Sequence, residues 1–279
     1  VGVSRYPALS PQRQLKGRLN DVTELEALMR KQGVANITVL ADGASASVAM
    51  PTRQSILDTI NHVTDSSRRG DWLILYFSGH GTQQPVTVDV DSEKDGLDEV
   101  FLPYDADRWD AGIKSIKNGL IDDQIAKLIQ AAINKGVSVW AIFDTCHAGT
   151  MTKDALSART WRYVPPAELG VPVVPKLRNT SPVRILARYQ VKDIVARKGQ
   201  LVAFYASQDN EPTPEERLLP NDGVAGIFSW QLAKIMARPK TERPDFGSVM
   251  KQIQEAYRAD GRVFPTPFME GASKLPVPF

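Results

Sequence analysis

Hydrophobic residues recur along the chain in two patterns, one typical of amphipathic helices and one typical of buried strands. Val22, Leu25 and Leu28 form an apolar stripe at helical spacing. This stripe predicts a helix capped by Asn20 or Asp21. By the same pattern, helices are predicted over residues 20–33, 52–66, 122–132, 225–237 and 246–258, with Asp122 or Asp123 capping the third of them.

Strands are predicted where short apolar runs lie between these helices. Residues 71–77 and 137–143 are nearly continuous in apolar side chains, as expected for central strands covered on both faces. Shorter strands are predicted at 37–40, 100–102 and 201–205, and the first residues have the pattern of a strand end. Because strands alternate with helices, the chain is predicted to form an α/β fold with a mostly parallel sheet.

Residues 151–199 interrupt this alternation, because prolines stand there among many lysines and arginines. This composition predicts a long surface loop. We interpret residues 1–279 as a single domain in which this loop separates residues 1–150 from residues 200–279.

The charge balance argues against two classes of partner. The chain carries 34 basic and 32 acidic residues, so no global field favours nucleic acid or an anionic membrane surface. No apolar run is long enough to predict a transmembrane helix, and no signal-peptide pattern is present. The abrupt start at Val1 suggests that upstream residues, including any signal, have been removed. The location is therefore left open, with the cytoplasm as the default and the periplasm or secretion as alternatives.

One cysteine and three histidines limit the available chemistry. A single cysteine excludes an internal disulfide and a cysteine-based zinc site. With only His62, His80 and His147, a metal site built on imidazoles is not expected. Cys146 is therefore either a small buried hydrophobic residue or a nucleophile.

The residues that follow the two central strands favour the nucleophile. The first strand runs into Ser78-Gly-His80-Gly81, and the second runs into Asp144-Thr-Cys146. Ligands of open α/β sheets bind beyond the carboxyl ends of the strands, so His80 and Cys146 are expected at the same edge of the sheet.

A thiol has a pKa of about 8.5 and needs a base at neutral pH. We assign Cys146 as the nucleophile and His80 as the base and then the acid. The backbone N–H groups of Gly81 and Cys146 are the natural oxyanion donors. His147 adjoins the cysteine, but successive residues point apart, so a structural role is expected for it.

Both strand-terminal motifs resemble those of a known family. YFSGHG (76–81) and DTCHAG (144–149) are similar to the two catalytic blocks of caspase-like peptidases, specifically of metacaspases and their bacterial relatives, the orthocaspases. Residues 15–21, 95–99, 121–123 and 265–271 are similar as well. The resemblance implies a caspase-like three-layer α/β/α sandwich with large-subunit-like (1–150) and small-subunit-like (200–279) parts. It also implies a monomeric cysteine endopeptidase that cleaves proteins or peptides after Arg or Lys.

The resemblance also implies a specificity pocket. Asp21 and Ser78 match positions that line it, Asp144 lies just before the nucleophile, and Asp209 is a further acidic candidate. Carboxylates attract a cationic side chain and repel an acidic one. The alternative for Asp21 is a helix cap. Arg18 stands where many metacaspases carry a pocket-lining cysteine, and an inward guanidinium there would oppose a basic substrate residue.

Calcium is the cofactor that the resemblance raises, as an activator and not as a requirement of the chemistry. Asp105, Asp122 and Asp123 are the candidate ligands, since hard cations prefer oxygen. Asp154 is offset by one residue from the expected position. Solvated acidic residues and helix caps are the alternative interpretation. An EF-hand is rejected because Leu102 stands where the loop that begins at residue 91 requires Glu.

Two other classes of function remain open. One is a catalytically silent caspase-like interaction module, which usually lacks the Cys or the His. The other is a nucleotide-binding enzyme, but no glycine-rich phosphate loop follows an early strand. The basic loop leads the chain away from Cys146, so we predict that it is the enzyme's own first substrate or its gate. Its candidate cleavage residues are Lys153, Arg159, Arg162, Lys176, Arg178, Arg184, Arg188 and Lys192.

Overall fold

The computed structural model describes residues 1–86, 96–146, 160–173, 198–208, 211–220 and 223–279. Its central sheet has the strand order β14-β11-β9-β3. The strands β3 (Trp72–Ser78), β9 (Ser138–Asp144) and β11 (Leu201–Tyr205) run parallel, and β14 (Phe268–Gly271) is antiparallel to β11. The mostly parallel sheet predicted from the sequence is therefore confirmed.

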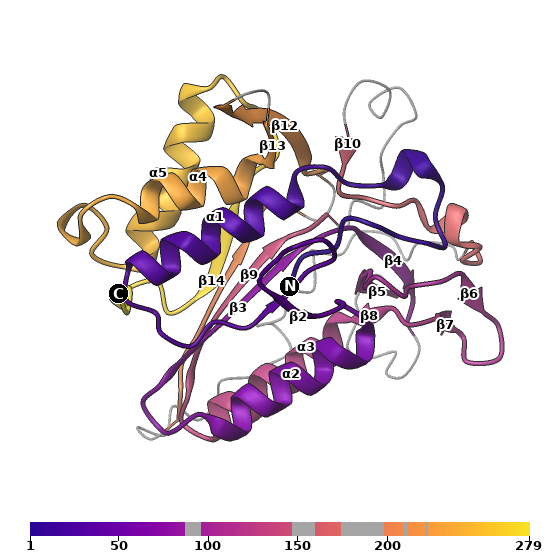
Figure 1. Cartoon of the computed structure of the whole chain (residues 1–279), viewed down its shortest axis with the longest axis horizontal. Helices are drawn as coiled ribbons and strands as arrows, with labels where there is room; N and C mark the ends of the chain where they lie inside the picture. The colour runs from indigo at the N-terminus through magenta and orange to yellow at the C-terminus, as the bar shows by residue number, and fades with distance from the viewer. Residues whose placement is uncertain (87–95, 147–159, 174–197, 209–210, 221–222) are drawn as a thin grey trace.

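Helices cover both faces of this sheet (Figure 1). One face carries α1 (Arg18–Lys31), α4 (Ile227–Met236) and α5 (Phe246–Ala259). The other carries α2 (Arg53–Ser66) and α3 (Asp122–Asn134). The three layers form the α/β/α sandwich that the family resemblance implied. Among the described residues, no helix has the length and apolar character needed to cross a membrane.

The central strands are apolar throughout because both of their faces are covered. Alternate residues of a strand point to opposite faces. In β9, Val139 and Phe143 belong to the core beneath α2 and α3, whereas Trp140 and Ile142 belong to the core beneath α1, α4 and α5. Full burial of such side chains contributes about 1.5–3 kcal/mol each. This burial fixes β9 at the centre of the molecule.

Two helix starts differ from the prediction. The first helix begins at Arg18 with Gly17 in the N-cap position, so the prediction that Asn20 or Asp21 caps it is wrong. The physical reason is that the Asp21 carboxylate is engaged by residues distant in sequence, described below. Similarly, Ile121 and not an aspartate occupies the N-cap position of α3.

Smaller strand pairs surround the carboxyl edge of the central sheet. β4 (Gly81–Pro85) continues directly from the His80 segment and pairs with β5 (Leu97–Phe101), which pairs with β8 (Leu120–Ile121). A second group consists of β10 (Thr160–Trp161), β12 (Pro214–Leu219) and β13 (Gly223–Gly226). The remaining pairs are β1 (Val39–Leu40) with β2 (Ser47–Ala49), and β6 (Trp109–Asp110) with β7 (Ser115–Ile116).

The prediction of a surface loop is wrong for residues 160–164, whereas several residues of 165–173 are exposed. Trp161, Arg162, Tyr163 and Val164 are all buried. Here β10 pairs with β12 and the short 3-10 helix η3 (Pro166–Leu169) follows. The physical reason is that this segment finds partners at the carboxyl edge of the sheet, a contact that its composition does not reveal. Residues 151–159 and 174–197 lie outside the described part of the chain.

Candidate active site

The register of the two central strands places His80 and Cys146 level with each other. The last pair of the β3–β9 ladder is Ser78 with Asp144, and each candidate catalytic residue lies two positions further along its strand. Neighbouring strands are about 4.8 Å apart. Both side chains therefore leave adjacent strands at the same edge of the sheet, and both are buried.

His80 is held by contacts to its ring and to its backbone. Its Nε2 lies 2.6 Å from the carbonyl oxygen of Arg13. A carbonyl only accepts, so this contact assigns the ring proton to Nε2 and leaves Nδ1 as the acceptor. Nδ1 is buried with no hydrogen-bond partner among the described residues. The His80 backbone N–H donates to the Tyr6 hydroxyl at 2.7 Å. Burial lowers the pKa of His80 to about 4, so the ring is neutral at pH 7.

Cys146 follows the end of β9 and contacts the segment that carries β10. Its Sγ donates to the carbonyl oxygen of Glu211 at 3.0 Å, and its side chain packs against Tyr163. The structure thus places the candidate nucleophile beside the residue that follows Arg162 in sequence. His147 lies outside the described residues.

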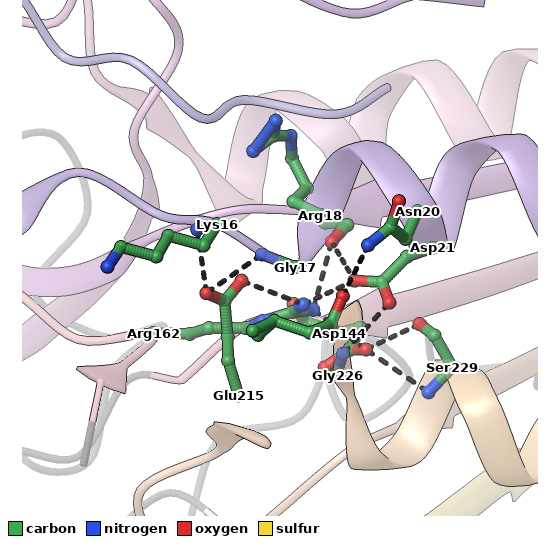
Figure 2. A network of polar contacts seen from close by, with 12 residues as sticks. Lys16, Gly17, Arg18, Asn20, Asp21, Asp144, Arg162, Glu215, Gly226 and Ser229 are labelled. Atoms are coloured by element: carbon green, nitrogen blue, oxygen red, sulfur yellow. Dashed lines mark hydrogen bonds and ion pairs between the residues drawn. The ribbon is translucent and has the colours of Figure 1, made fainter. Parts of the chain in front are cut away.

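Carboxylates at this edge of the sheet enclose the guanidinium of Arg162 (Figure 2). Nη1 pairs with Asp144 Oδ2 at 2.7 Å and donates to Ser78 Oγ at 2.9 Å. Nη2 pairs with Asp21 Oδ2 and lies 3.3 Å from Glu215 Oε1. The side chains of Arg162 and of all three acidic residues have 0% exposure. Asp21, Ser78 and Asp144, three of the pocket residues predicted from the sequence, therefore surround the buried Arg162 guanidinium.

The start of α4 holds two of these carboxylates in place. Asp144 Oδ2 accepts from the backbone N–H of Ser229 at 3.2 Å and from its hydroxyl at 2.5 Å. Asp21 Oδ1 accepts from the backbone N–H of Gly226 at 2.8 Å. The first turn of a helix has unpaired N–H groups and a partial positive charge, which stabilise carboxylates. This contact explains why Asp21 does not cap its own helix.

Burial and charge act in opposite directions inside the pocket. Burial raises the pKa of Asp21 to about 6, although the Arg162 charge opposes the shift. Burial also disfavours the charge of Arg162, but Asp144, Asp21 and Glu215 together hold its pKa well above the usual value. The pocket is thus built to keep one guanidinium charged in the protein interior.

The backbone around Arg162 is bound on both sides. Its N–H donates to the carbonyl oxygen of Thr213 at 2.9 Å. Its own carbonyl oxygen accepts from the Gly81 N–H at 3.0 Å, and Val164 N–H donates to the Gly81 carbonyl at 3.1 Å. Gly81 is one of the two donors expected for an oxyanion. The segment 160–164 therefore lies across the site in the manner of a bound peptide, with the Arg162 carbonyl at that donor.

Sequence reasoning missed Glu215. It lies in β12, and its Oε2 accepts from the backbone N–H groups of Lys16 and Gly17 at 2.9 and 3.0 Å. The only local signal is a Glu-Glu pair in a stretch that was not predicted to be a strand. Only the pairing of β12 with β10 brings this carboxylate to Arg162.

Two further residues, Arg18 and Asp209, were considered in the sequence-based prediction of the pocket. Arg18 is buried, but its guanidinium points away from the carboxylates (Figure 2). It donates to Ser4 Oγ instead. The anticipated clash with a basic substrate residue is therefore absent from this arrangement. Asp209 lies outside the described residues.

The calcium candidates do not form a site by themselves. Asp105 Oδ1 accepts from the Arg53 backbone N–H at 2.8 Å, whereas Asp122 and Asp123 lie in the first turn of α3. Within the described ranges, no three His, Cys, Asp or Glu side chains gather in a way that could hold a metal ion. The role of calcium as an activator stays a prediction.

A mostly parallel α/β/α sandwich with a histidine and a cysteine at the ends of adjacent strands defines a caspase-like protein. The fold of this chain is similar to a solved structure of a protein from Geobacter sulfurreducens, with a TM-score of 0.61 and 22% sequence identity. The match covers 99% of this chain and 92% of that one. Residues 1–154 match the family model "Metacaspase, peptidase C14 domain". The chain therefore belongs to the metacaspase family.

Curated relatives agree with this assignment. Over 144 residues, the chain is 35% identical to Metacaspase-1 of Candida albicans, which covers 50% of this chain and 30% of the relative. Over 226 residues, it is 28% identical to Metacaspase-1 of Sclerotinia sclerotiorum, which covers 79% of this chain and 49% of the relative. The chain thus spans half or less of the length of these relatives.

Proposed function

We propose that this protein is a cysteine endopeptidase that cleaves protein or peptide chains after arginine, and more weakly after lysine. The observation that carries the proposal is the way in which the side chain and the carbonyl group of Arg162 are bound. Its guanidinium is enclosed by Asp21, Asp144 and Glu215, and its carbonyl oxygen accepts from the Gly81 N–H. A substrate arginine bound in this way would present its carbonyl carbon next to Cys146.

In the proposed mechanism, the Cys146 thiol gives its proton to His80 Nδ1, and the thiolate attacks the carbonyl carbon. The Gly81 and Cys146 N–H groups receive the resulting oxyanion. His80 then donates the proton to the leaving amine, and a thioester forms. Water hydrolyses the thioester with His80 again as the base, which frees the acid and restores the thiol.

The resting state in this mechanism is a neutral pair. Burial holds the pKa of His80 near 4, so the imidazole is uncharged at pH 7, and a thiol with the ordinary pKa of about 8.5 is mostly protonated there. The Sγ–H now points to the Glu211 carbonyl and must turn to Nδ1 before the transfer. The Arg13 carbonyl favours this step because it holds the ring proton on Nε2.

We further propose that the Arg162–Tyr163 bond is the first bond this enzyme cleaves. Arg162 is the basic residue of the 160–173 segment that occupies the carboxylate pocket, so the intact chain excludes other basic residues from it. Cleavage would release the Arg162 carbonyl and allow the pocket to open. The sheet and its helices would hold the two fragments together, because their core does not depend on this bond.

The test is a time course of the purified chain followed by intact-mass spectrometry. Wild-type protein should convert to two co-eluting fragments with new ends at Arg162 and Tyr163. Cys146→Ala and His80→Ala should stay intact, and cleavage of an Arg-terminated fluorogenic peptide should fall at least about 10³-fold in either variant. An Asp-terminated peptide should be cleaved at least about 100-fold more slowly than the Arg peptide.

Arg162→Gln should abolish cleavage at this bond. Arg262→Gln is the matched control, because Arg262 also makes a two-point pair, with Glu216 at 3.0 and 2.8 Å, but outside the pocket. The proposal fails if wild-type protein remains one chain and hydrolyses no Arg peptide. It also fails if Cys146→Ala retains more than about a tenth of the activity. The monomeric state and the absence of nucleic-acid or membrane partners stay predictions.

A further inference from the structure

The third carboxylate of the pocket is fixed more firmly than a surface acid. The Glu215 side chain is buried, and its Oε2 accepts from two successive backbone N–H groups, those of Lys16 and Gly17. Its Oε1 is left facing Arg162 Nη2 at 3.3 Å. The Glu215 carboxylate therefore has a defined position before any cation enters, and within the guanidinium it pairs with Nη2.

The acceptors of the pocket fall into two groups, one for each terminal nitrogen of Arg162. Nη1 meets Ser78 Oγ at 2.9 Å and Asp144 Oδ2 at 2.7 Å. Nη2 meets Asp21 and Glu215. A guanidinium presents donors in a planar fork and can serve both groups at once. A lysine ammonium has three donors on a single nitrogen, so it cannot place a nitrogen beside each group as the guanidinium does.

Lysine would therefore leave part of the buried carboxylate set without a charged donor at hydrogen-bonding distance. Removing one partner from a buried charged set is strongly unfavourable, because the remaining charge has neither water nor a counter-ion. Glu215 is the acid most affected, because its pair with Arg162 is longer, at 3.3 Å, than the 2.7 Å pair of Asp144 and is lost first when the cation is smaller.

We propose that Glu215 is a specificity-determining residue that makes this pocket select arginine over lysine. This inference rests on the proposed function, because it refines the specificity of the same site. It predicts that loss of the Glu215 charge weakens arginine binding more than lysine binding, so that the two substrates become more alike.

The first test compares two fluorogenic peptides that differ only in a terminal Arg or Lys, assayed after self-cleavage is complete. We expect wild-type protein to prefer Arg by about tenfold or more in kcat/KM, as lost charge-assisted hydrogen bonds imply. Glu215→Gln should reduce this preference at least about fivefold, mainly through the Arg peptide. Glu216→Gln is the matched control, since the neighbouring Glu216 pairs with Arg262. It should keep the wild-type ratio within twofold, and an unchanged ratio in Glu215→Gln overturns the inference.

The second test needs no catalysis and so separates this inference from the proposed function. In the Cys146→Ala background, Arg162→Lys is combined with Glu215→Gln in a double-mutant cycle of thermal unfolding. Arg162→Lys should lower Tm by about 3–6 °C when Glu215 is present and by clearly less in Glu215→Gln. This difference corresponds to a coupling of about tenfold in the unfolding equilibrium constant between the two substitutions. Strictly additive Tm shifts would show that Glu215 does not discriminate the two side chains. If no peptide is hydrolysed but the cycle is non-additive, the proposed function fails and the role of Glu215 stands.

Discussion

Gly226 leaves no room for a side chain beside the pocket, which makes Gly226→Ala a sharp test of the site. A Cβ at this position would lie 2.5 Å from Arg162 Nη2 and 2.6 Å from Asp144 Oδ2. A Cβ atom does not approach other heavy atoms closer than about 3.0 Å, so one of the partners must shift. The backbone itself is ordinary, with φ −70° and ψ 132°, so alanine introduces no backbone strain. The effect of the substitution is therefore steric and local.

The size of the effect follows from which group must move. Forcing an extra methyl group into a packed interior costs about 1–3 kcal/mol. If the guanidinium is displaced from its carboxylates, the broken buried pairs cost about 3–5 kcal/mol. We therefore expect Gly226→Ala to lower the free energy of unfolding of the intact chain by about 3 kcal/mol. A similar loss of binding in the transition state would slow cleavage after Arg at least about 100-fold.

The assay measures chemical denaturation of the Cys146→Ala background and, in the active enzyme, self-cleavage and Arg-peptide hydrolysis. Gly247→Ala in α5 is the control, because its Cβ would meet its nearest neighbour, the Ser273 carbonyl oxygen, at 3.3 Å. Alanine there also favours the helix by up to about 1 kcal/mol, so little loss is expected. Wild-type stability and wild-type cleavage rates in Gly226→Ala would refute the assignment of this cluster as the arginine pocket.

Two further predictions concern protonation and the support of the catalytic histidine. Burial raises the pKa of Asp21 to about 6, so its charge is lost as the pH falls through that value, whereas burial keeps His80 neutral down to about pH 4. Self-cleavage should therefore decline below about pH 6, and an acid limb near pH 4 in its rate profile would contradict the role of Asp21. Tyr6→Phe removes the acceptor of the buried His80 N–H and should lower the free energy of unfolding by about 1–3 kcal/mol. The control is Tyr205→Phe, which removes a longer and partly buried contact to Glu270 of 3.3 Å. It should change the free energy of unfolding by less than about 0.5 kcal/mol. Equal losses in the two variants would show that the Tyr6 hydroxyl does not support His80.

Several features of the site could be predicted because they depend on neighbouring residues. The apolar runs before His80 and Cys146 identify two buried parallel strands, and the motifs that follow place both residues at one edge of the sheet. The pocket residues Asp21, Ser78 and Asp144 were predicted from the family resemblance of their motifs, and the structure brings all three to Arg162.

Other features could not be predicted because they depend on contacts between distant segments. The composition of residues 151–199 indicates exposure, yet Arg162 is buried, because its charge is matched by acids from α1, β9 and β12. Gly226 has an ordinary φ, and nothing in its local sequence shows that a methyl group there would meet a guanidinium.

By itself, the sequence determined the α/β class, the order of the central elements and the residue types at the strand ends. Each of these follows from local periodicity, because burial of a face selects apolar residues at fixed spacing. Only the tertiary structure decided what fills the carboxylate pocket and which third acid completes it. A buried guanidinium needs several acceptors at once, and Asp21, Arg162 and Glu215 acquire their roles only when the folded chain brings their segments within hydrogen-bonding distance.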